Sequence, residues 1–256
     1  ARVPREPPAG EAAPHGGAAD GDQRGDRGVG NPAPHNLNLQ EASGPRERAL
    51  ANISAIEALA AVEAADGRAT EEQLTALAAF SGWGGCPDAF SDKPAWKDIA
   101  DRVGELLSED EYASARGSVL TAYYTPQPIV DAVWAALADH GIGTAGSPDH
   151  VLEPGCGTGN FLARVPASSD VALYGIELDE VSARICAALN PAANVVSGAL
   201  EACYATEATF DAVIGNVPFS GDISIPYPVA GQTRPIPIHD YFLERSVYSV
   251  RSGGLV

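Results

Sequence analysis

One stretch of the sequence has the residue types and spacing of a ligand-binding loop. At residues 151–161 a short apolar run ends in Glu153 and continues with three glycines at alternate positions. Glycines at the end of a strand let backbone amides approach a bound ligand closely. A nicotinamide-binding loop would carry its third glycine where this chain has Asn160. The stretch therefore predicts a buried strand that turns sharply into a helix and holds a different ligand at the turn.

A second acid follows at the spacing of a ribose-binding residue. The next apolar strand, predicted at residues 172–179, contains Glu177 about 20 residues after the glycines, where doubly wound folds place an acid on ribose hydroxyls. Asp179 precedes an amphipathic stretch at 181–189 and suits a helix cap. We therefore assign Glu177 to a ribose and Asp179 to the cap.

A tetrapeptide, Asn216-Val217-Pro218-Phe219, follows the strand predicted at 210–215 and resembles the [D/N/S]-P-P-[Y/F/W] tetrapeptide of enzymes that methylate exocyclic or amide nitrogens. An aromatic amino nitrogen such as that of adenine is a poor nucleophile, because its lone pair is delocalised into the ring. Asn216 Oδ1 and the Val217 carbonyl could accept both of its N–H hydrogens and favour a tetrahedral nitrogen. Pro218 would stiffen the turn, and Phe219 would stack on the base, a contact worth ~1–3 kcal/mol in other base-binding sites.

Three stretches resemble motifs of the S-adenosylmethionine (AdoMet) methyltransferases. The glycine loop with Glu153 at the strand end resembles motif I. Residues 216–219 resemble the [D/N/S]-P-P-[Y/F/W] tetrapeptide of enzymes that methylate exocyclic or amide nitrogens, with Val217 in place of the first proline. Residues 122–128 resemble motif X, which precedes motif I in gamma-ordered adenine methyltransferases and type I modification subunits. The order X, I, II, IV implies the N6-adenine DNA methyltransferases.

Flanking phrases are similar to the methylase region of large methyltransferase–helicase proteins that plasmids, phages and integrative elements carry. These phrases lie at residues 80–85, 216–219, 238–242 and 252–254. In those relatives a helicase region would follow. The resemblance therefore implies a mobile-element protein with a possible helicase region in the full-length parent.

The resemblance also implies an activity and a set of site residues. The activity is transfer of a methyl group from AdoMet to the exocyclic N6 amino group of adenine in DNA, with the base flipped out of the duplex. Thr125 would cap a helix that starts at Pro126, and the free amides there would receive the methionine carboxylate. The implied catalytic residues are Asn216, Val217, Pro218 and Phe219. The implied cofactor-binding residues are Tyr124, Thr125, Pro126, Glu153, Pro154, Gly155, Cys156, Gly157, Gly159, Asn160, Phe161, Glu177, Leu178 and Asn216.

One departure from the family pattern and two alternative functions stay open. The strand predicted at 194–198 ends where many relatives carry an acid for the adenine amino group of the cofactor, but Gly198 and Ala199 have no such side chain. Glu201 or a backbone carbonyl would have to substitute. The same tetrapeptide serves enzymes that methylate RNA bases or a protein glutamine. The chain could also be an inactive AdoMet-binding or interaction fragment of a mobile-element protein.

The predicted fold is α/β, with a Rossmann-like AdoMet methyltransferase sheet. We expect a disordered tail at 1–45, a helical region at 46–118 and the methyltransferase domain at 119–256. Residues 253–256 predict the start of a fifth strand. Because the sequence stops there and contains no methionine, we expect a truncated fragment.

Two segments keep more than one interpretation. The glycine-flanked Trp83 at residues 80–85 could stack on the cofactor or on the acceptor base, or it could pin a loop to the core. Residues 220–237 carry four prolines without a clear period, which predicts a long loop. That loop could close over an extruded base, with Arg234 on a phosphate, or it could be an insertion without a role.

Composition limits the possible partners. The formal net charge of −18 and a lysine content restricted to Lys93 and Lys97 count against strong DNA binding by this part of the protein, because phosphate contacts need cations. We therefore expect the DNA-binding surface to lie elsewhere in the full-length parent protein. The four cysteines show no metal-ligand spacing, so no metal is predicted. No apolar run of ~20 residues is present, which predicts a cytoplasmic protein without a membrane partner.

Overall fold

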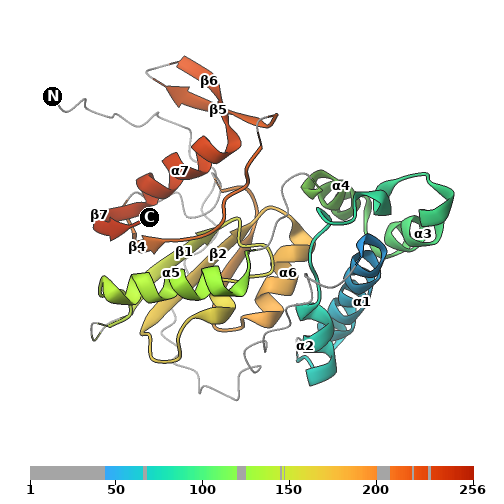
Figure 1. The fold of residues 1–256 in the computed structure, drawn as a ribbon, viewed down its shortest axis with the longest axis horizontal. Coiled ribbons are helices and arrows are strands. Elements are labelled where there is room, and N and C mark those ends of the chain that lie inside the picture. The colour runs from blue at the N-terminus through green and yellow to red at the C-terminus, as the bar shows by residue number, and fades with distance from the viewer. Residues whose placement is uncertain are drawn as a thin grey trace, which may run out of the picture.

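A computed structural model describes residues 44–65, 68–119, 125–144, 146, 148–200, 208–220, 222–229 and 232–256. The predicted disordered tail, apart from its last two residues, lies outside this part of the chain. The described residues form a helical region beside an α/β sheet region (Figure 1).

The helical region is built around buried aromatic and aliphatic side chains. Thr70 and Ser108 cap two of its helices through the capping boxes that their sequences predict. Trp83 is 1% exposed and packs edge-on against Phe80 and Phe90. It is part of this core, so the structural interpretation of residues 80–85 is confirmed. The helices are α1 (Pro45–Ala64), α2 (Glu71–Ala78), α3 (Lys97–Leu106) and α4 (Glu109–Ser118), with the short 3₁₀ turns η1 (Pro87–Phe90) and η2 (Pro94–Trp96).

The sheet is five-stranded and entirely parallel, in the order β3-β2-β1-β4-β7. The order and direction confirm the predicted α/β class, and β7 is the predicted fifth strand. The strands are β1 (Asp149–Pro154), β2 (Val171–Glu177), β3 (Asn194–Ser197), β4 (Phe210–Val213) and β7 (Val250–Leu255).

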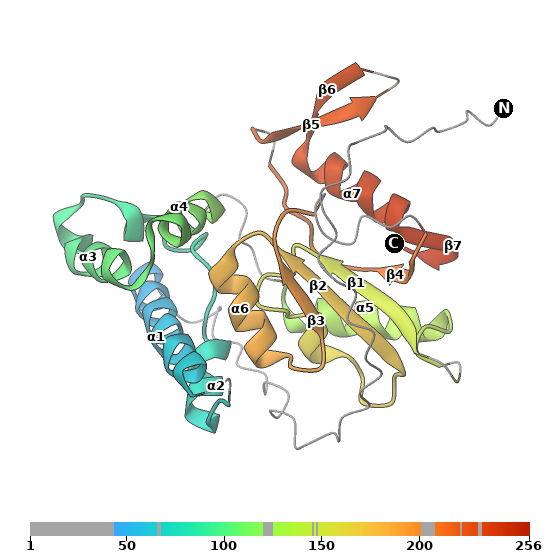
Figure 2. The ribbon, with the colours of Figure 1, turned by 180° about the vertical axis from the view of Figure 1, so that it is seen from behind.

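Both faces of this sheet are covered. Along β1, Val151 belongs to the core cluster that includes Trp134 of α5 (Gln127–Asp139) and Cys186 of α6 (Glu180–Leu189). Leu152 belongs to the cluster on the other face, with Tyr241 of α7 (Ile238–Ser249). Side chains alternate between the faces of a strand, so burial on both faces explains the nearly continuous apolar runs of these strands. Figure 1 shows α5 in front of the sheet, and Figure 2 shows it behind.

Helix α6 joins the two regions. Val181, Ile185 and Leu189 contribute to the core of the helical region. On the same helix, Arg184 forms ion pairs with Glu63 of α1 and Glu111 of α4, each at 2.6 Å. These ion pairs hold α1 and the first turn of α4 against α6.

The predicted long loop at 220–237 is wrong. Residues of this segment form an antiparallel hairpin of β5 (Ser224–Val229) and β6 (Gln232–Pro237), in which Pro226 faces Pro235. A two-stranded ribbon has a free edge on each strand, so residues without an N–H donor are tolerated. The partly buried Ile225 and Tyr227 alternate with exposed residues. The prolines obscured this period of two in the sequence.

Candidate functional site

A cavity of about 460 Å³ lies at the carboxyl ends of β1, β2 and β4. Open α/β sheets bind ligands at this edge, where the strand order reverses. Most of the predicted site residues line it: Thr125, Glu153, Gly155, Cys156, Gly157, Asn160, Phe161, Glu177, Leu178, Asn216 and Pro218. Pro126, Pro154, Gly159, Val217 and Phe219 are described but do not line it, and Tyr124 lies outside the described residues.

The glycine loop follows β1 as predicted, but the helix expected after it is absent. Gly155, Gly157 and Gly159 all have positive φ, at 70°, 55° and 84°. Side chains are strained in this region of backbone space, which explains the glycines. A 3₁₀ turn at Leu162–Arg164 replaces the expected helix. Val165 follows this turn with a ψ of 130°, because it precedes Pro166 and a residue before proline avoids helical backbone angles.

Glu177 lies at the end of β2 and organises the loop. Its Oε2 accepts a hydrogen bond from the Gly157 amide at 2.8 Å, and its Oε1 accepts one from the Asp179 amide at 2.9 Å. Burial raises the pKa of Glu177, while these amide bonds oppose the shift. A carboxylate has about four acceptor positions, so Glu177 can also receive hydroxyl donors from a ligand.

Asp179 is the cap of α6, as predicted. Its carboxylate accepts hydrogen bonds from the Ser182 amide at 3.0 Å and from the Ser182 hydroxyl at 2.6 Å. It also accepts one from the Ser114 hydroxyl of α4 at 2.9 Å. These contacts connect the helical region to the cavity wall next to Glu177.

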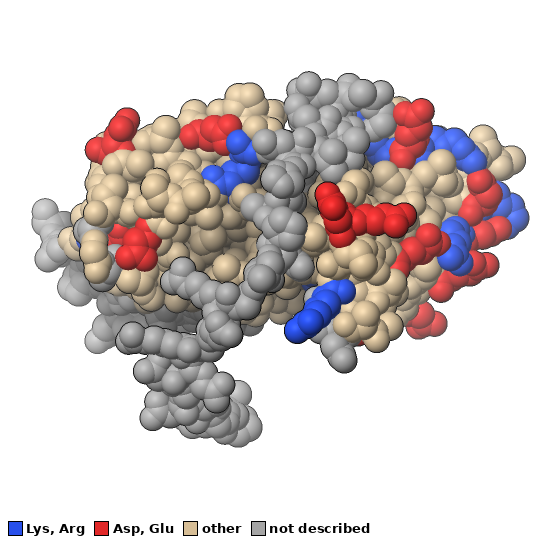
Figure 3. Space-filling view, turned by 90° about the horizontal axis from the view of Figure 1, so that it is seen from below, with Lys and Arg blue, Asp and Glu red and all other residues tan. Residues whose placement is uncertain are grey.

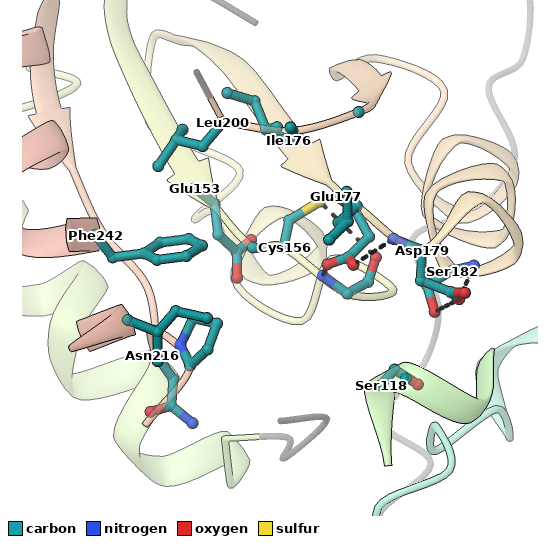
Figure 4. Close-up of a pocket in the computed structure, with 18 of the residues that line it drawn as sticks. Ser118, Glu153, Cys156, Ile176, Glu177, Asp179, Ser182, Leu200, Asn216 and Phe242 are labelled. Atoms are coloured by element: carbon teal, nitrogen blue, oxygen red, sulfur yellow. Dashed lines mark hydrogen bonds between the residues drawn. The ribbon is translucent and has the colours of Figure 1, made fainter. Parts of the chain in front are cut away.

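Glu153 is a buried acid of the cavity. It is 4% exposed, and its Oε2 has no hydrogen-bond partner among the residues that the structure describes. Burial raises the pKa of Glu153 well above the ordinary 4.5, with smaller contributions from Cys186 and Glu177. Figure 4 shows the carboxylate between Phe242 and Cys156.

Replacing Glu153 with Gln should therefore raise thermal stability at neutral pH and leave it nearly unchanged near pH 4. The unfolded chain ionises this acid near 4.5, whereas the folded chain favours the protonated form. The stabilising contribution of the protonated Glu153 carboxyl is present below pH 4.5 and is lost as the pH rises toward the raised pKa of the folded chain. Thermal melts of both proteins at about pH 4, 6 and 8 measure the effect. A melting difference that does not change with pH would contradict it.

The tetrapeptide after β4 meets the glycine loop at the cavity. Asn216 and Pro218 line the cavity, and a Cβ at Gly155 would lie 3.7 Å from Pro218 Cδ. Phe219 is 73% exposed and stacks on His239, with ring centroids 4.4 Å apart. In Figure 4 Asn216 lies on one side of the cavity, and Glu177 and Asp179 lie on the other.

The predicted cap at Thr125 is wrong. Pro126 has extended backbone angles and precedes α5, and no side chain of the described residues caps this helix. The Pro126 carbonyl accepts the first helical hydrogen bonds, from the Ile129 and Val130 amides. Pro128 takes the second helical position, where its missing N–H costs nothing.

Sequence reasoning missed one wall of the cavity. Ser114, Gly117 and Ser118 of α4 line it. Their spacing places them on one helix face, but nothing in the sequence shows what that face meets. Residues of the hairpin, of α7 and of the segment after β3 also line the cavity: Ile223, Ile225, Ile238, Tyr241, Phe242, Gly198, Ala199 and Leu200. Glu201, the proposed substitute for the missing acid, lies outside the described residues.

The described cysteines, Cys86, Cys156 and Cys186, are buried thiols. Burial raises the pKa of Cys86 to about 11. Cys156 lines the cavity with its Sγ 3.9 Å from that of Cys186, and this contact, together with burial, raises its pKa well above the ordinary value. Within the described ranges, no group of three or more His, Cys, Asp and Glu side chains could hold a metal ion. The helices in these ranges also lack the combination of length and apolar composition that crossing a membrane requires.

Comparisons with known proteins place this geometry in context. One curated relative is Defense against restriction protein B of Escherichia phage P1, 29% identical over 163 residues. The match covers 62% of this chain, and the chain spans 7% of that protein's length.

Among solved structures, a type I restriction-modification system methyltransferase subunit from Streptococcus thermophilus is 13% identical, with a TM-score of 0.41, over 81% of this chain and 66% of that one. A TehB-like SAM-dependent methyltransferase from Corynebacterium glutamicum is 22% identical, with a TM-score of 0.23, over 35% of this chain and 54% of that one. The family model described as N-6 DNA Methylase matches residues 97–227, about half of the sequence. The chain belongs to the N-6 DNA methylase family.

Proposed function

We propose that this chain carries the AdoMet-binding and methyl-transfer core of an N6-adenine DNA methyltransferase. One observation supports this most directly. A single cavity is lined both by the glycine loop with Glu177 and by Asn216 and Pro218 of the tetrapeptide. A donor pocket and an acceptor pocket must share such a space, because a methyl group moves directly from one ligand to the other.

The residues of the cavity fit AdoMet. Glu177, already fixed by two backbone amides, would accept hydrogen bonds from the ribose hydroxyls. The exposed Leu178 beside it would pack on the adenine. Thr125 lines the cavity on the side of α5, where the methionine end would lie. AdoMet supplies a methyl group on a positively charged sulfur.

The acceptor side would be formed by the tetrapeptide. Asn216 Oδ1 and the Val217 carbonyl would accept the two hydrogens of the adenine amino group. Phe219 would exchange its stacking partner His239 for the flipped base, a contact of ~1–3 kcal/mol in other base-binding sites. Unpairing and unstacking that base would cost a few kcal/mol.

DNA binding would depend on parts of the protein beyond the described surface. In the helical region, basic side chains pair with acids: Arg46 with Asp98, Lys93 with Asp88, Lys97 with Asp101 and Arg102 with Glu57. Figure 3 shows acidic and basic side chains interspersed over the helical region, without a continuous basic patch on that face of the described residues. We propose that another region, such as a helicase region in a mobile-element parent, holds the DNA. The name of the phage relative refers to defense against restriction, and we propose a related role for this protein.

Calorimetric titration with AdoMet tests the donor pocket. Glu177→Ala removes a charged acceptor, so it should weaken binding by roughly 10-fold or more, which corresponds to the ~1.5–3 kcal/mol of a charge-assisted hydrogen bond. Glu105→Ala is a matched control, because Glu105 is exposed on α3 and absent from the cavity lining. Unchanged affinity in Glu177→Ala would remove Glu177 from the ribose site.

A panel of acceptors tests the acceptor pocket. Labelled AdoMet is incubated with the chain and with duplex DNA, single-stranded DNA, RNA or protein. Transfer to adenine in DNA is expected. Transfer to RNA or to a protein glutamine would replace the DNA assignment. AdoMet binding without transfer to any acceptor, in a longer protein as well, would favour an inactive remnant.

A further inference from the structure

The charge of the cavity is one-sided. Glu153, Glu177 and Asp179 line it, and its described lining includes no Lys, Arg or His. Unlike charges attract and like charges repel more strongly in a cavity of low polarity than in water. Such a cavity favours a ligand that carries positive charge.

The three acids differ in how their oxygens are satisfied. Asp179 accepts from two serine hydroxyls and one amide, and Glu177 accepts from two amides. Glu153 Oε2 has no hydrogen-bond partner within the described part of the chain, although Glu153 is only 4% exposed. The groups that influence its ionisation are the Cys186 thiol and Glu177, which oppose it, and the Leu162 backbone, which favours it. Burial disfavours the charged form of Glu153, and a cation beside it would favour that form, so Glu153 is the acid whose ionisation a cationic ligand would change most.

The position of Glu153 indicates which part of the ligand it would meet. It is the penultimate residue of β1, the strand between β2 and β4. A Cβ at Gly215, which immediately precedes Asn216, would lie 3.5 Å from Glu153 Cγ. In Figure 4 Glu153 lies between Glu177 and Asn216. If Glu177 holds the ribose and Asn216 holds the acceptor, the sulfur must lie between them, on the side of Glu153.

We propose that the Glu153 carboxylate attracts the positive charge on the cofactor sulfur. The cavity therefore prefers AdoMet, a sulfonium, over its product S-adenosylhomocysteine, whose sulfur is neutral. This inference rests on the proposed function. In the transfer, a bond forms between the acceptor nitrogen and the methyl carbon, and the bond between sulfur and that carbon breaks. The sulfur keeps the electron pair and becomes neutral, and the nitrogen then loses a proton to solvent. Glu153 thereby loses its cationic partner, which weakens the hold on the product. The methionine ammonium is common to both ligands and cancels in the comparison.

Calorimetric affinities for three ligands test this preference. The ligands are AdoMet, S-adenosylhomocysteine and sinefungin, which carries an amine near the position of the sulfonium. The wild-type chain at about pH 8 should prefer both cationic ligands by roughly 10-fold, the share of the Coulomb attraction that survives desolvation. Glu153→Gln has the same shape without the charge. It should bind S-adenosylhomocysteine as the wild type does and should lose the preference to within about two-fold.

Glu177→Gln is the matched control. Glu177→Gln should lower the affinity for all three ligands by the same factor, because the ribose is common to them. The inference is overturned if the wild type binds S-adenosylhomocysteine as tightly as AdoMet, or if Glu153→Gln keeps the preference. Failure of all three ligands to bind a wild-type chain with a folded circular-dichroism spectrum would overturn the proposed function as well. The same spectrum identifies a variant that does not fold. In that case the affinities of the wild-type chain for sinefungin and for S-adenosylhomocysteine decide the proposal.

Discussion

Asn216→Ala should lower methyl transfer by roughly 10²–10³-fold and leave the affinity for AdoMet within about two-fold. The rate loss is the size seen when one fixed hydrogen-bonding group at a reacting centre is removed from other enzymes. Asn216 lines the cavity from the end of β4, whereas Glu177 lies across the cavity at the end of β2. The acceptor side can therefore lose its side-chain oxygen without disturbing the ribose side. Single-turnover transfer of label from AdoMet, with calorimetry in parallel, measures both quantities.

Asn216→Asp provides the control, because an aspartate keeps an oxygen at the same place. It should retain much of the transfer rate that Asn216→Ala loses. If both variants lose AdoMet binding in proportion to activity, Asn216 acts on the donor rather than on the acceptor. An Asn216→Ala chain with full activity would leave the amino group to the Val217 carbonyl alone.

The parallel strands and their terminal acids could be predicted because their signals are local. A strand buried on both faces reads as a continuous apolar run, and the polar residue that ends it marks the ligand edge of the sheet. This reasoning placed Glu153 and Glu177 at the ends of β1 and β2, where the structure has them. The caps at Thr70, Ser108 and Asp179 were predictable for the same reason, since each depends on a few neighbouring residues.

Features that depend on distant contacts were not predictable from local patterns. Ser114 of α4 bonds to Asp179, 65 residues away in the sequence, and this contact helps to bring α4 to the cavity. The hairpin β5–β6 is stabilised by pairing between its strands and by packing on α7, through contacts such as Tyr227 with Tyr241. Its prolines, taken alone, favoured a loop. The start of α5 was also missed, because Thr-Pro and Gln-Pro both satisfy the local rules for a helix start.

Gly159→Ala should destabilise the fold and weaken AdoMet binding together. Gly159 has a φ of 84°, and a Cβ there would lie 2.6 Å from Cys186 Sγ and 2.7 Å from Asn190 Nδ2. Both neighbours are buried, and Asn190 is held by its bond to the Cys186 carbonyl at 3.0 Å. Backbone strain and overpacking cost ~1–3 kcal/mol each. The melting temperature should fall by roughly 2–4 °C per kcal/mol.

Gly104→Ala separates this specific effect from the general effect of losing a glycine. Gly104 lies inside α3, and a Cβ there would meet nothing within 4 Å. Alanine in a helix interior is favoured over glycine by ~0.5–1 kcal/mol, so this variant should melt higher than the wild type and bind AdoMet equally well. The melting temperatures of the two variants should therefore move in opposite directions, and calorimetry should show a loss of AdoMet affinity in Gly159→Ala alone. If Gly159→Ala melts as the wild type does, the loop can shift to accept a side chain, and the requirement for glycine at this position lies in the ligand rather than in the fold.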